Sequence, residues 1–281
     1  MSAPRIALAL GGGGARGLAH IPLLEAFDEL GVRPHRLAGS SMGGLVAAAY
    51  AAGMPARDIH ERFGRMLVQK GDSWRDIFGR SDLRKWFDIV ELNIGRGGLI
   101  RGDSLREFLA AGHIEADFAD LAIPLKLVAA DYWTWEEVVI DRGELPLAVQ
   151  ATMAVPGVFL PVERNGRVLI DGSTVDPVPY DLWNDDADVR IAIDVAGGRP
   201  TRKHKQPTIF QSVFNTVQIM QRAIINAKVA DDPPDILIRP DIGGVRMFAF
   251  HKIDEVYAAA ETAKDELKRE LARVLEGKAA E

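Results

Sequence analysis

The sequence contains no cysteine. Disulfide bonds, thiolate nucleophiles and cysteine-ligated zinc sites are therefore excluded. It also lacks any apolar run of the roughly 18 residues that a membrane-spanning helix needs. The apolar stretch 6–10 leads directly into four glycines, unlike the long apolar region of a secretory signal. These absences predict a cytoplasmic protein, whose surface can still make peripheral contact with the inner membrane.

The sequence also has no excess of positive charge. Lys and Arg total 34 and Asp and Glu total 40, which gives a formal net charge of −6. Sequence-independent binding to nucleic acid depends on an excess of positive charge, so we expect no nucleic-acid partner. No cluster of residues with metal-ligand spacing is visible either, and we expect neither a metal nor a cofactor.

The 281 residues are 47% hydrophobic, enough to bury a large core. No internal repeat or clear linker divides the chain, so we expect a single domain over residues 1–281. Within it, residues 54–112 are less regular and predict a helical excursion, helical around 55–68, that either packs in the ordinary way or covers a site as a lid. Residues 197–207 are basic and rich in Gly and Pro, which predicts an exposed loop.

Short apolar runs typical of buried parallel strands alternate with stretches of helical spacing, and this pattern predicts an α/β fold. Strands are expected at 5–10, 37–38, 125–130, 167–171, 190–195 and 235–239, with 136–141 as a hairpin partner. Helices are expected at 18–30, from 147, at 209–230 and at 253–275. The helix at 209–230 is apolar around much of its circumference, so we expect it to be buried or to lie at a subunit contact.

A glycine-rich loop follows the first expected strand. Gly12, Gly14 and Gly17 fit a dinucleotide-binding fingerprint, but the next strand has no acidic residue at its tip for a ribose hydroxyl. A phosphate-binding P-loop is excluded because no Gly-Lys-Ser/Thr follows. The third interpretation is an oxyanion hole, in which successive backbone N–H groups turn toward one point and Arg16 adds positive charge.

A serine motif one strand and one helix later favours the oxyanion hole. The sequence Gly39-Ser40-Ser41-Met42-Gly43 fits the G-x-S-x-G nucleophile elbow, with Ser41 at its centre. Gly39 and Gly43 would let the strand and the following helix approach closely, and the Met42 N–H would lie at a helix N-terminus, where negative charge is favoured. Neighbouring parallel strands would bring both turns to the same edge of the sheet.

The two motifs at this spacing resemble the patatin-like phospholipase family in its short bacterial form, and the resemblance extends from Ile6 to about Asp241. It implies a three-layer α/β/α sandwich with a mostly parallel central sheet, and a Ser–Asp dyad that works without histidine or metal. The family's later Asp-Gly-Gly or Asp-Gly-Ala corresponds to Asp171-Gly172-Ser173, so Ser173 departs from the pattern. Thr152 stands where the family usually has serine.

Carried onto this chain, the resemblance implies Ser41 as nucleophile and Asp171 as the base that accepts its proton. The oxyanion hole would comprise Gly12, Gly13, Gly14, Arg16 and Met42, with Gly39 and Gly43 shaping the elbow. The three loops are expected to meet at one edge of a parallel sheet.

These residues predict a serine acyl hydrolase of the phospholipase A, lysophospholipase or carboxylesterase type, acting on a lipid or another acyl ester. The alternatives are a non-catalytic regulatory or scaffold protein of the same fold, and a nucleotide-dependent enzyme. The acyl chain and the oligomeric state are left open.

Other polar residues receive lesser roles. Asp131 ends a strand, where a turn or cap residue is the ordinary interpretation. His204 and His251 follow Asp171 as a conventional triad would require, but both are interpreted as surface residues. His20 is expected to pack near the site without carrying protons.

Overall fold

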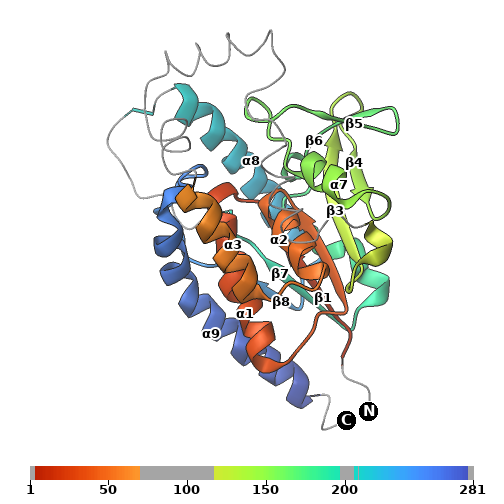
Figure 1. The fold of residues 1–281 in the computed structure, drawn as a ribbon, viewed down its shortest axis with the longest axis vertical. Coiled ribbons are helices and arrows are strands. Elements are labelled where there is room, and N and C mark those ends of the chain that lie inside the picture. The colour runs from red at the N-terminus through yellow and green to blue at the C-terminus, as the bar shows by residue number, and fades with distance from the viewer. Residues whose placement is uncertain (1–3, 70–116, 197–205, 208, 278–281) are drawn as a thin grey trace.

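The computed structural model describes residues 4–69, 117–196, 206–207 and 209–277 (Figure 1). Most of the expected lid, residues 70–112, lies outside the described residues. His204 and most of the basic loop 197–207 also lie outside them, while Gln206 and Pro207 are exposed. The start of the expected excursion is helical, as predicted: α3 spans Ala56–Gln69.

In the part of the chain that the structure describes, eight strands form one sheet in the order β5-β6-β3-β2-β1-β7-β8, with β4 also paired to β3. Their bounds are β1 Ile6–Leu10, β2 Arg36–Ser40, β3 Leu125–Asp131, β4 Glu137–Ile140, β5 Val162–Arg164, β6 Arg167–Asp171, β7 Val189–Ile193 and β8 Ile236–Ile238. The pairs β1–β2, β1–β7, β2–β3 and β7–β8 are parallel. The pairs β3–β4, β3–β6 and β5–β6 are antiparallel. The expected mostly parallel sheet is confirmed.

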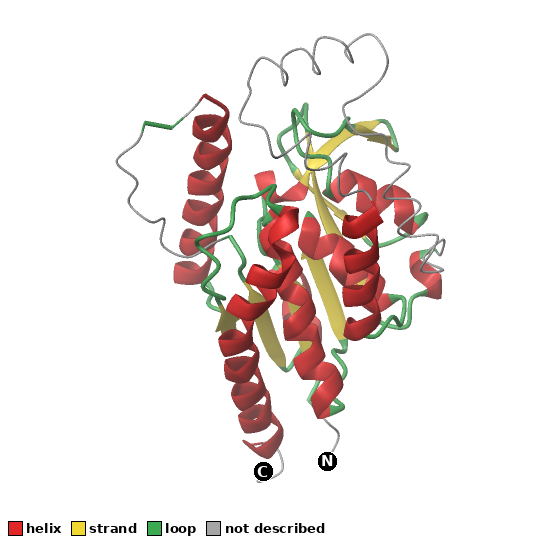
Figure 2. Cartoon of the chain, turned by 60° about the vertical axis from the view of Figure 1, so that its left-hand side comes forward, coloured by secondary structure: helices red, strands yellow, loops and turns green. Residues whose placement is uncertain are grey.

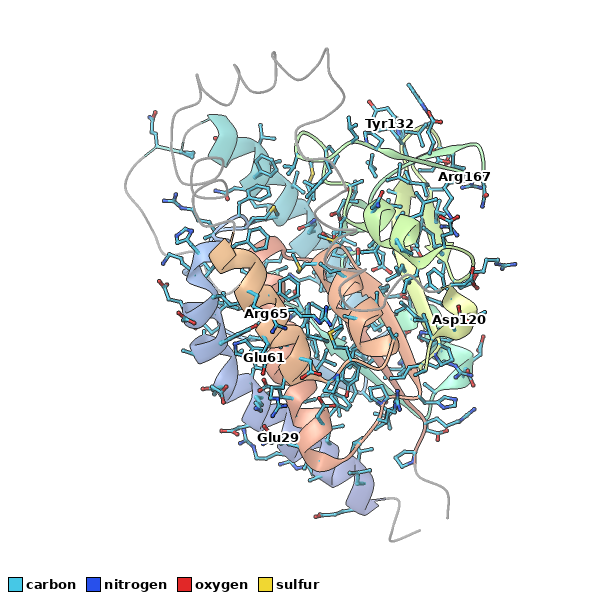
Figure 3. All side chains as sticks on the ribbon, viewed as in Figure 1. Glu29, Glu61, Arg65, Asp120, Tyr132 and Arg167 are labelled. Atoms are coloured by element: carbon cyan, nitrogen blue, oxygen red, sulfur yellow. The ribbon has the colours of Figure 1, made fainter. Side chains whose placement is uncertain are left out.

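Helices cover both faces of this sheet and give the expected three layers (Figures 1 and 2). The other α-helices within the described residues are α1 His20–Leu30, α2 Met42–Ala51, α7 Leu145–Thr152, α8 Ile209–Asp231 and α9 Ile253–Gly277. One layer is formed by α1, α2, α3 and α9, and its outer surface carries charged side chains such as Glu29, Glu61 and Arg65 (Figure 3). The other layer holds the 3-10 segment Tyr180–Asp186 and part of α8.

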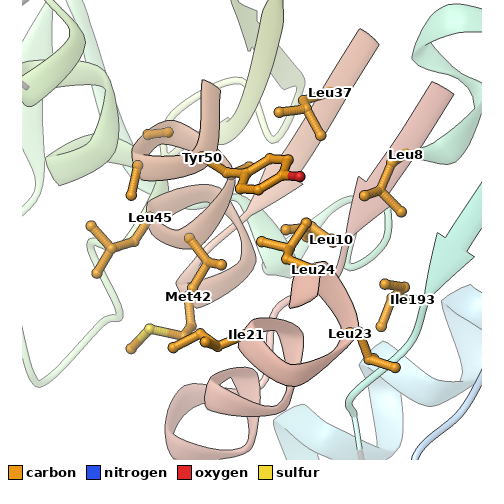
Figure 4. Close-up of a cluster of buried hydrophobic side chains, with 14 of the residues drawn as sticks. Leu8, Leu10, Ile21, Leu23, Leu24, Leu37, Met42, Leu45, Tyr50 and Ile193 are labelled. Carbon is orange, nitrogen blue, oxygen red and sulfur yellow. The ribbon is translucent and has the colours of Figure 1, made fainter. Parts of the chain in front are cut away.

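Alternating strand residues build two cores of different character. On one face, Leu8, Leu10 and Leu37 meet large side chains of α1 and α2 (Figure 4). On the other face, Ala9 and Ala38 join Ala192 and neighbours including Val178, Tyr180 and Ile225. Because successive side chains of a strand point to opposite faces, small residues on the second face let the other layer approach closely.

The helix α8 differs from the expectation of burial. Among its described side chains Gln221 and Ile225 are buried, whereas Val213, Val217, Ile219 and Met220 are exposed. Ile225 and Val229 join the core on the second face of the sheet, and the exposed apolar residues lie nearer the N-terminus of the helix. A subunit contact on α8 stays a prediction. Within the described ranges, no helix is both long enough and apolar enough to cross a membrane.

Candidate active site

The carboxyl ends of β2 and β6 meet along one edge of β3. Val128 pairs with both β2 and β4, and Ala129 pairs with both β4 and β6. Since a strand has two edges, β2 and β6 must share the edge opposite β4. β2 therefore ends at Ser40 beside Val128, and β6 ends at Asp171 beside Ala129. The strand β6 joins β3 in the antiparallel direction, so Asp171 arrives at this edge from the direction opposite to β2.

Ser41 sits on a sharp turn between β2 and α2. Its backbone has φ 54° and ψ −127°, a conformation that residues other than glycine rarely adopt and that stores strain. Close approach of the helix requires glycine: a Cβ on Gly43 would lie 2.5 Å from the Gly11 carbonyl oxygen, and one on Gly39 would lie 2.6 Å from the Gly44 Cα. The segment therefore has the geometry expected of a nucleophile elbow.

The Ser41 hydroxyl donates a hydrogen bond to Asp171, with 2.6 Å between Oγ and Oδ2. Both residues are buried. Burial raises the pKa of Asp171 to about 6, and hydrogen bonds from Ser41 and from the backbone and hydroxyl of Ser173 limit the rise. Asp171 is thus a stronger base than an ordinary aspartate and is still mostly ionised at neutral pH.

The glycine loop lies against the elbow, but one predicted donor is engaged elsewhere. The Gly12 N–H donates to the Pro177 carbonyl at 2.9 Å, so it is not available to an oxyanion, and the expectation for Gly12 is corrected. Its role is steric: a Cβ there would overlap the Ser173 hydroxyl and lie 3.1 Å from the Ser41 Cβ. Nothing in the sequence signals that the chain near Pro177 would reach this loop.

The other predicted donors remain available. Within the described ranges, the N–H groups of Gly13, Gly14 and Met42 have no hydrogen-bond acceptor. The Gly13 carbonyl accepts bonds from the Arg16 backbone N–H at 3.3 Å and from Arg16 Nε at 3.4 Å. Because the peptide is planar and trans, holding that carbonyl points the Gly14 N–H in the opposite direction. Arg16 therefore orients the loop, and its guanidinium stays buried, with its pKa lowered to about 10 by that burial.

Among the histidines that the structure describes, none takes part in the pair. His20 is fully buried, with Nε2 2.7 Å from the Gly11 carbonyl oxygen, and burial lowers its pKa to about 4. It is therefore neutral at pH 7 and packs beneath the glycine loop, in agreement with the sequence-based expectation. His251 is exposed. Asp131 accepts backbone N–H bonds from Trp133 and Thr134, as a turn residue does.

The two departures from the family pattern fit the site without displacing the dyad. Thr152 is buried, and its hydroxyl accepts a bond from the Ser41 N–H at 2.9 Å, so α7 helps to hold the elbow. The Ser173 N–H donates to Asp171 Oδ1 at 2.8 Å, and its hydroxyl lies 3.1 Å from that of Ser40. The hydrogen bond between Ser40 and Ser173 links β2 to the end of β6, and nothing in the sequence indicated it beyond the place of Ser40 next to Ser41.

Comparison with known proteins gives a consistent result. A family model described as patatin-like phospholipase matches residues 8–182, a span that contains both Ser41 and Asp171. A protein of Mycobacterium tuberculosis named as an uncharacterized NTE family protein is 36% identical over 236 residues, which cover 82% of this chain and 60% of the relative. Lysophospholipase NTE1 of Kluyveromyces lactis is 23% identical over 290 residues, or 92% of this chain and 19% of the relative. The chain therefore spans less than two thirds of the length of these relatives.

A solved structure shares the fold. VipD from Legionella pneumophila superposes with a TM-score of 0.54 at 14% sequence identity, covering 96% of this chain and 68% of that chain. In the part of this chain that is described, no group of three or more His, Cys, Asp or Glu side chains is placed to hold a metal ion.

Proposed function

We propose, from the premise that this chain belongs to the patatin-like phospholipase family, that it is a serine acyl hydrolase in which Ser41 is the nucleophile and Asp171 the base. The observation that carries the proposal is the 2.6 Å hydrogen bond between Ser41 Oγ and Asp171 Oδ2. The bond joins the serine of a strained elbow to a buried carboxylate of raised pKa. Such an arrangement activates a hydroxyl that would otherwise be a weak nucleophile.

In the acylation step, Ser41 Oγ attacks the carbonyl carbon of the ester while Asp171 accepts the hydroxyl proton. The N–H groups of Gly13, Gly14 and Met42 stabilise the negative charge that develops on the carbonyl oxygen. When the tetrahedral intermediate collapses, the alcohol leaves with the proton from Asp171. A water molecule then attacks the acyl-enzyme, gives its proton to Asp171 and releases the fatty acid as the proton returns to Ser41.

The substrate class we propose is a lipid acyl ester. The name of the lysophospholipase relative supports this class, and family membership supports it independently. A panel of phospholipids and lysophospholipids, with release of fatty acid as the readout, distinguishes the members of the class.

A fluorophosphonate probe tests the mechanism, because it labels only an activated serine. We expect the wild-type protein to be labelled and the Ser41→Ala variant to remain unlabelled. Hydrolysis of a p-nitrophenyl acyl ester should fall by about 10³-fold or more in Ser41→Ala and in Asp171→Asn. Asp185→Asn is the matched control, since Asp185 is exposed.

Two outcomes would contradict the proposal. Unlabelled wild-type protein would favour the non-catalytic scaffold of the same fold. Full activity in Asp171→Asn would show that another group acts as the base.

A further inference from the structure

The turn that follows β3 presents large aromatic side chains to solvent. Trp133 is 74% exposed, Trp135 is 84% exposed and Tyr132 is 48% exposed. Tryptophan is highly buried on average, so a neighbouring pair of this exposure is unusual. Trp183 shows the ordinary case, because its Nε1 donates to the Leu37 carbonyl and its ring lies beneath Lys126. We call residues 132–135 the aromatic turn.

The aromatic turn is held in one conformation by its backbone. The Asp131 carboxylate accepts the N–H groups of Trp133 at 3.0 Å and Thr134 at 3.4 Å, and its carbonyl accepts the N–H of Trp135 at 2.9 Å. Trp135 adopts φ 63°, a left-handed conformation that is unfavourable for a bulky residue. The rings of Tyr132 and Trp133 contact each other edge to face. The exposed indoles are therefore presented by an ordered and locally strained segment rather than by a loose loop.

The aromatic turn lies at the same edge of the sheet as the dyad. Ala129 of β3 pairs with Asp171, and the turn begins three residues further along β3. At about 3.3 Å per residue, its start lies roughly 10 Å beyond the level of Asp171. The Tyr132 N–H also donates to the Val168 carbonyl, which ties the turn to β6. In Figure 3, Tyr132 and Arg167 lie together at one end of the molecule, and Glu29 lies near the other end.

The charges beside the aromatic turn leave no surplus of positive charge, because two carboxylates face one guanidinium. Arg167 lies 3.6 Å from Asp131 and 3.7 Å from Glu136. This cation is already paired and gives no surplus attraction for anionic headgroups. The remaining feature is the pair of indoles, which are amphipathic and favour the boundary between water and acyl chains. The chemistry therefore fits a zwitterionic lipid surface better than an anionic one.

We propose that the aromatic turn inserts into the surface of zwitterionic phospholipid and thereby brings that surface to Ser41. The inference rests on the proposed function, because it concerns how a lipid acyl ester reaches the site. Insertion of the two rings removes apolar area from water, and the rigid turn lowers the entropy lost on binding.

Vesicle sedimentation tests this inference in a Ser41→Ala background, where the proposed hydrolysis cannot alter the lipid. We expect the full chain to bind phosphatidylcholine vesicles, with a partition coefficient that falls roughly 10- to 100-fold in Trp133→Ser/Trp135→Ser. The matched control is Ile219→Ser/Met220→Ser on α8, whose side chains are 69% and 60% exposed. This control should bind as the background protein does. Equal thermal unfolding midpoints establish that each variant is folded.

Several results would overturn the inference. One is unchanged binding by the tryptophan variant, and another is loss of binding in the α8 variant alone. Binding only to phosphatidylserine vesicles, abolished by about 0.5 M salt, would show an electrostatic contact instead. Dimerisation that disappears in the tryptophan variant, without vesicle binding, would assign the aromatic turn to a second copy of the chain. Failure of the proposed function appears separately, as absence of probe labelling in the wild-type protein, because vesicle binding is measured without catalysis.

Discussion

At the residue scale, the proposed mechanism depends on how the environment of Asp171 sets its basicity. Burial raises the pKa to about 6 from an ordinary value of 3.8, and hydrogen bonds from Ser41 and Ser173 oppose the rise. A general base works best when its pKa lies near the working pH and it remains ionised. The balance between burial and these hydrogen bonds therefore brings the pKa of Asp171 close to the working pH. The hydrogen bond from the Ser173 hydroxyl is the contribution that a substitution can remove.

We expect Ser173→Ala to change the pH dependence of kcat/KM. The base must be ionised, so activity should fall as the pH drops through the pKa of Asp171, near 6 in the wild-type protein. Removing the hydroxyl leaves the carboxylate less stabilised, which moves the acidic limb upward by roughly 0.5 to 1 pH unit. The position of the acidic limb is measured from the hydrolysis of a soluble p-nitrophenyl ester between about pH 4.5 and 8, a range that brackets the limb. Thr174→Ala is the control, since Thr174 is exposed; a limb that stays in place in Ser173→Ala would contradict the prediction.

At the scale of elements, the site depends on two contacts of backbone on backbone. The start of α2 touches the end of β1, where Gly43 meets the carbonyl oxygens of Leu10 and Gly11. The end of β6 touches β3, where Gly172 meets the Val128 carbonyl. At both places the neighbouring atoms belong to the backbone, so they cannot move aside for a larger residue as the end of a flexible side chain could. These contacts fix the distance between the elbow, the glycine loop and Asp171.

We expect the Gly43→Ala variant to lose both activity and stability, because the new alanine Cβ has no space between α2 and β1. Relief of the overlap requires a shift of the elbow, and overpacking of this kind costs about 1–3 kcal/mol of unfolding free energy or more. Gly64→Ala in α3 is the matched control, since a Cβ there meets nothing within 4 Å. That variant should gain about 0.5–1 kcal/mol, the helix preference of alanine over glycine. Denaturant unfolding and probe labelling measure both, and a Gly43→Ala protein of wild-type stability would refute the steric argument.

For the molecule as a whole, α9 completes the layer that supports the site. Its residues Val256, Ala260, Leu267 and Leu271 are fully buried, and α9 packs along α1. The buried Lys264 of α9 also forms ion pairs with Glu25 and Glu29 of α1, which tie the two helices together. The family match ends at residue 182, so this support comes from the part of the chain beyond it.

We expect Leu267→Ala to lower the unfolding free energy by about 2–5 kcal/mol, the usual cost of a cavity at a fully buried leucine. Below the unfolding transition, probe labelling of Ser41 should persist, because Leu267 does not contact the dyad. Glu266→Ala is the control, since Glu266 is exposed. Equal unfolding midpoints for the two variants would show that α9 is not part of the cooperative core.

The site could be predicted from the sequence where local rules apply. A glycine loop after an apolar strand and a serine between glycines are local patterns that indicated Ser41 and the N–H groups, and the family resemblance that they carry implied Asp171. Prediction failed where a distant segment intervenes. The Pro177 carbonyl accepts the N–H of Gly12, which was expected to serve the oxyanion hole.

The sequence by itself determined the alternation of strands and helices and the glycine-flanked turn at Ser41, because hydrophobic spacing and backbone conformation are local properties. Only the tertiary structure decided that β2 and β6 share one edge of β3, which places Ser41 within 2.6 Å of Asp171 across 130 residues of chain. It alone also decided the raised pKa of that carboxylate and the exposure of the aromatic turn. Burial and pairing depend on which distant segments pack together, and no local pattern records that.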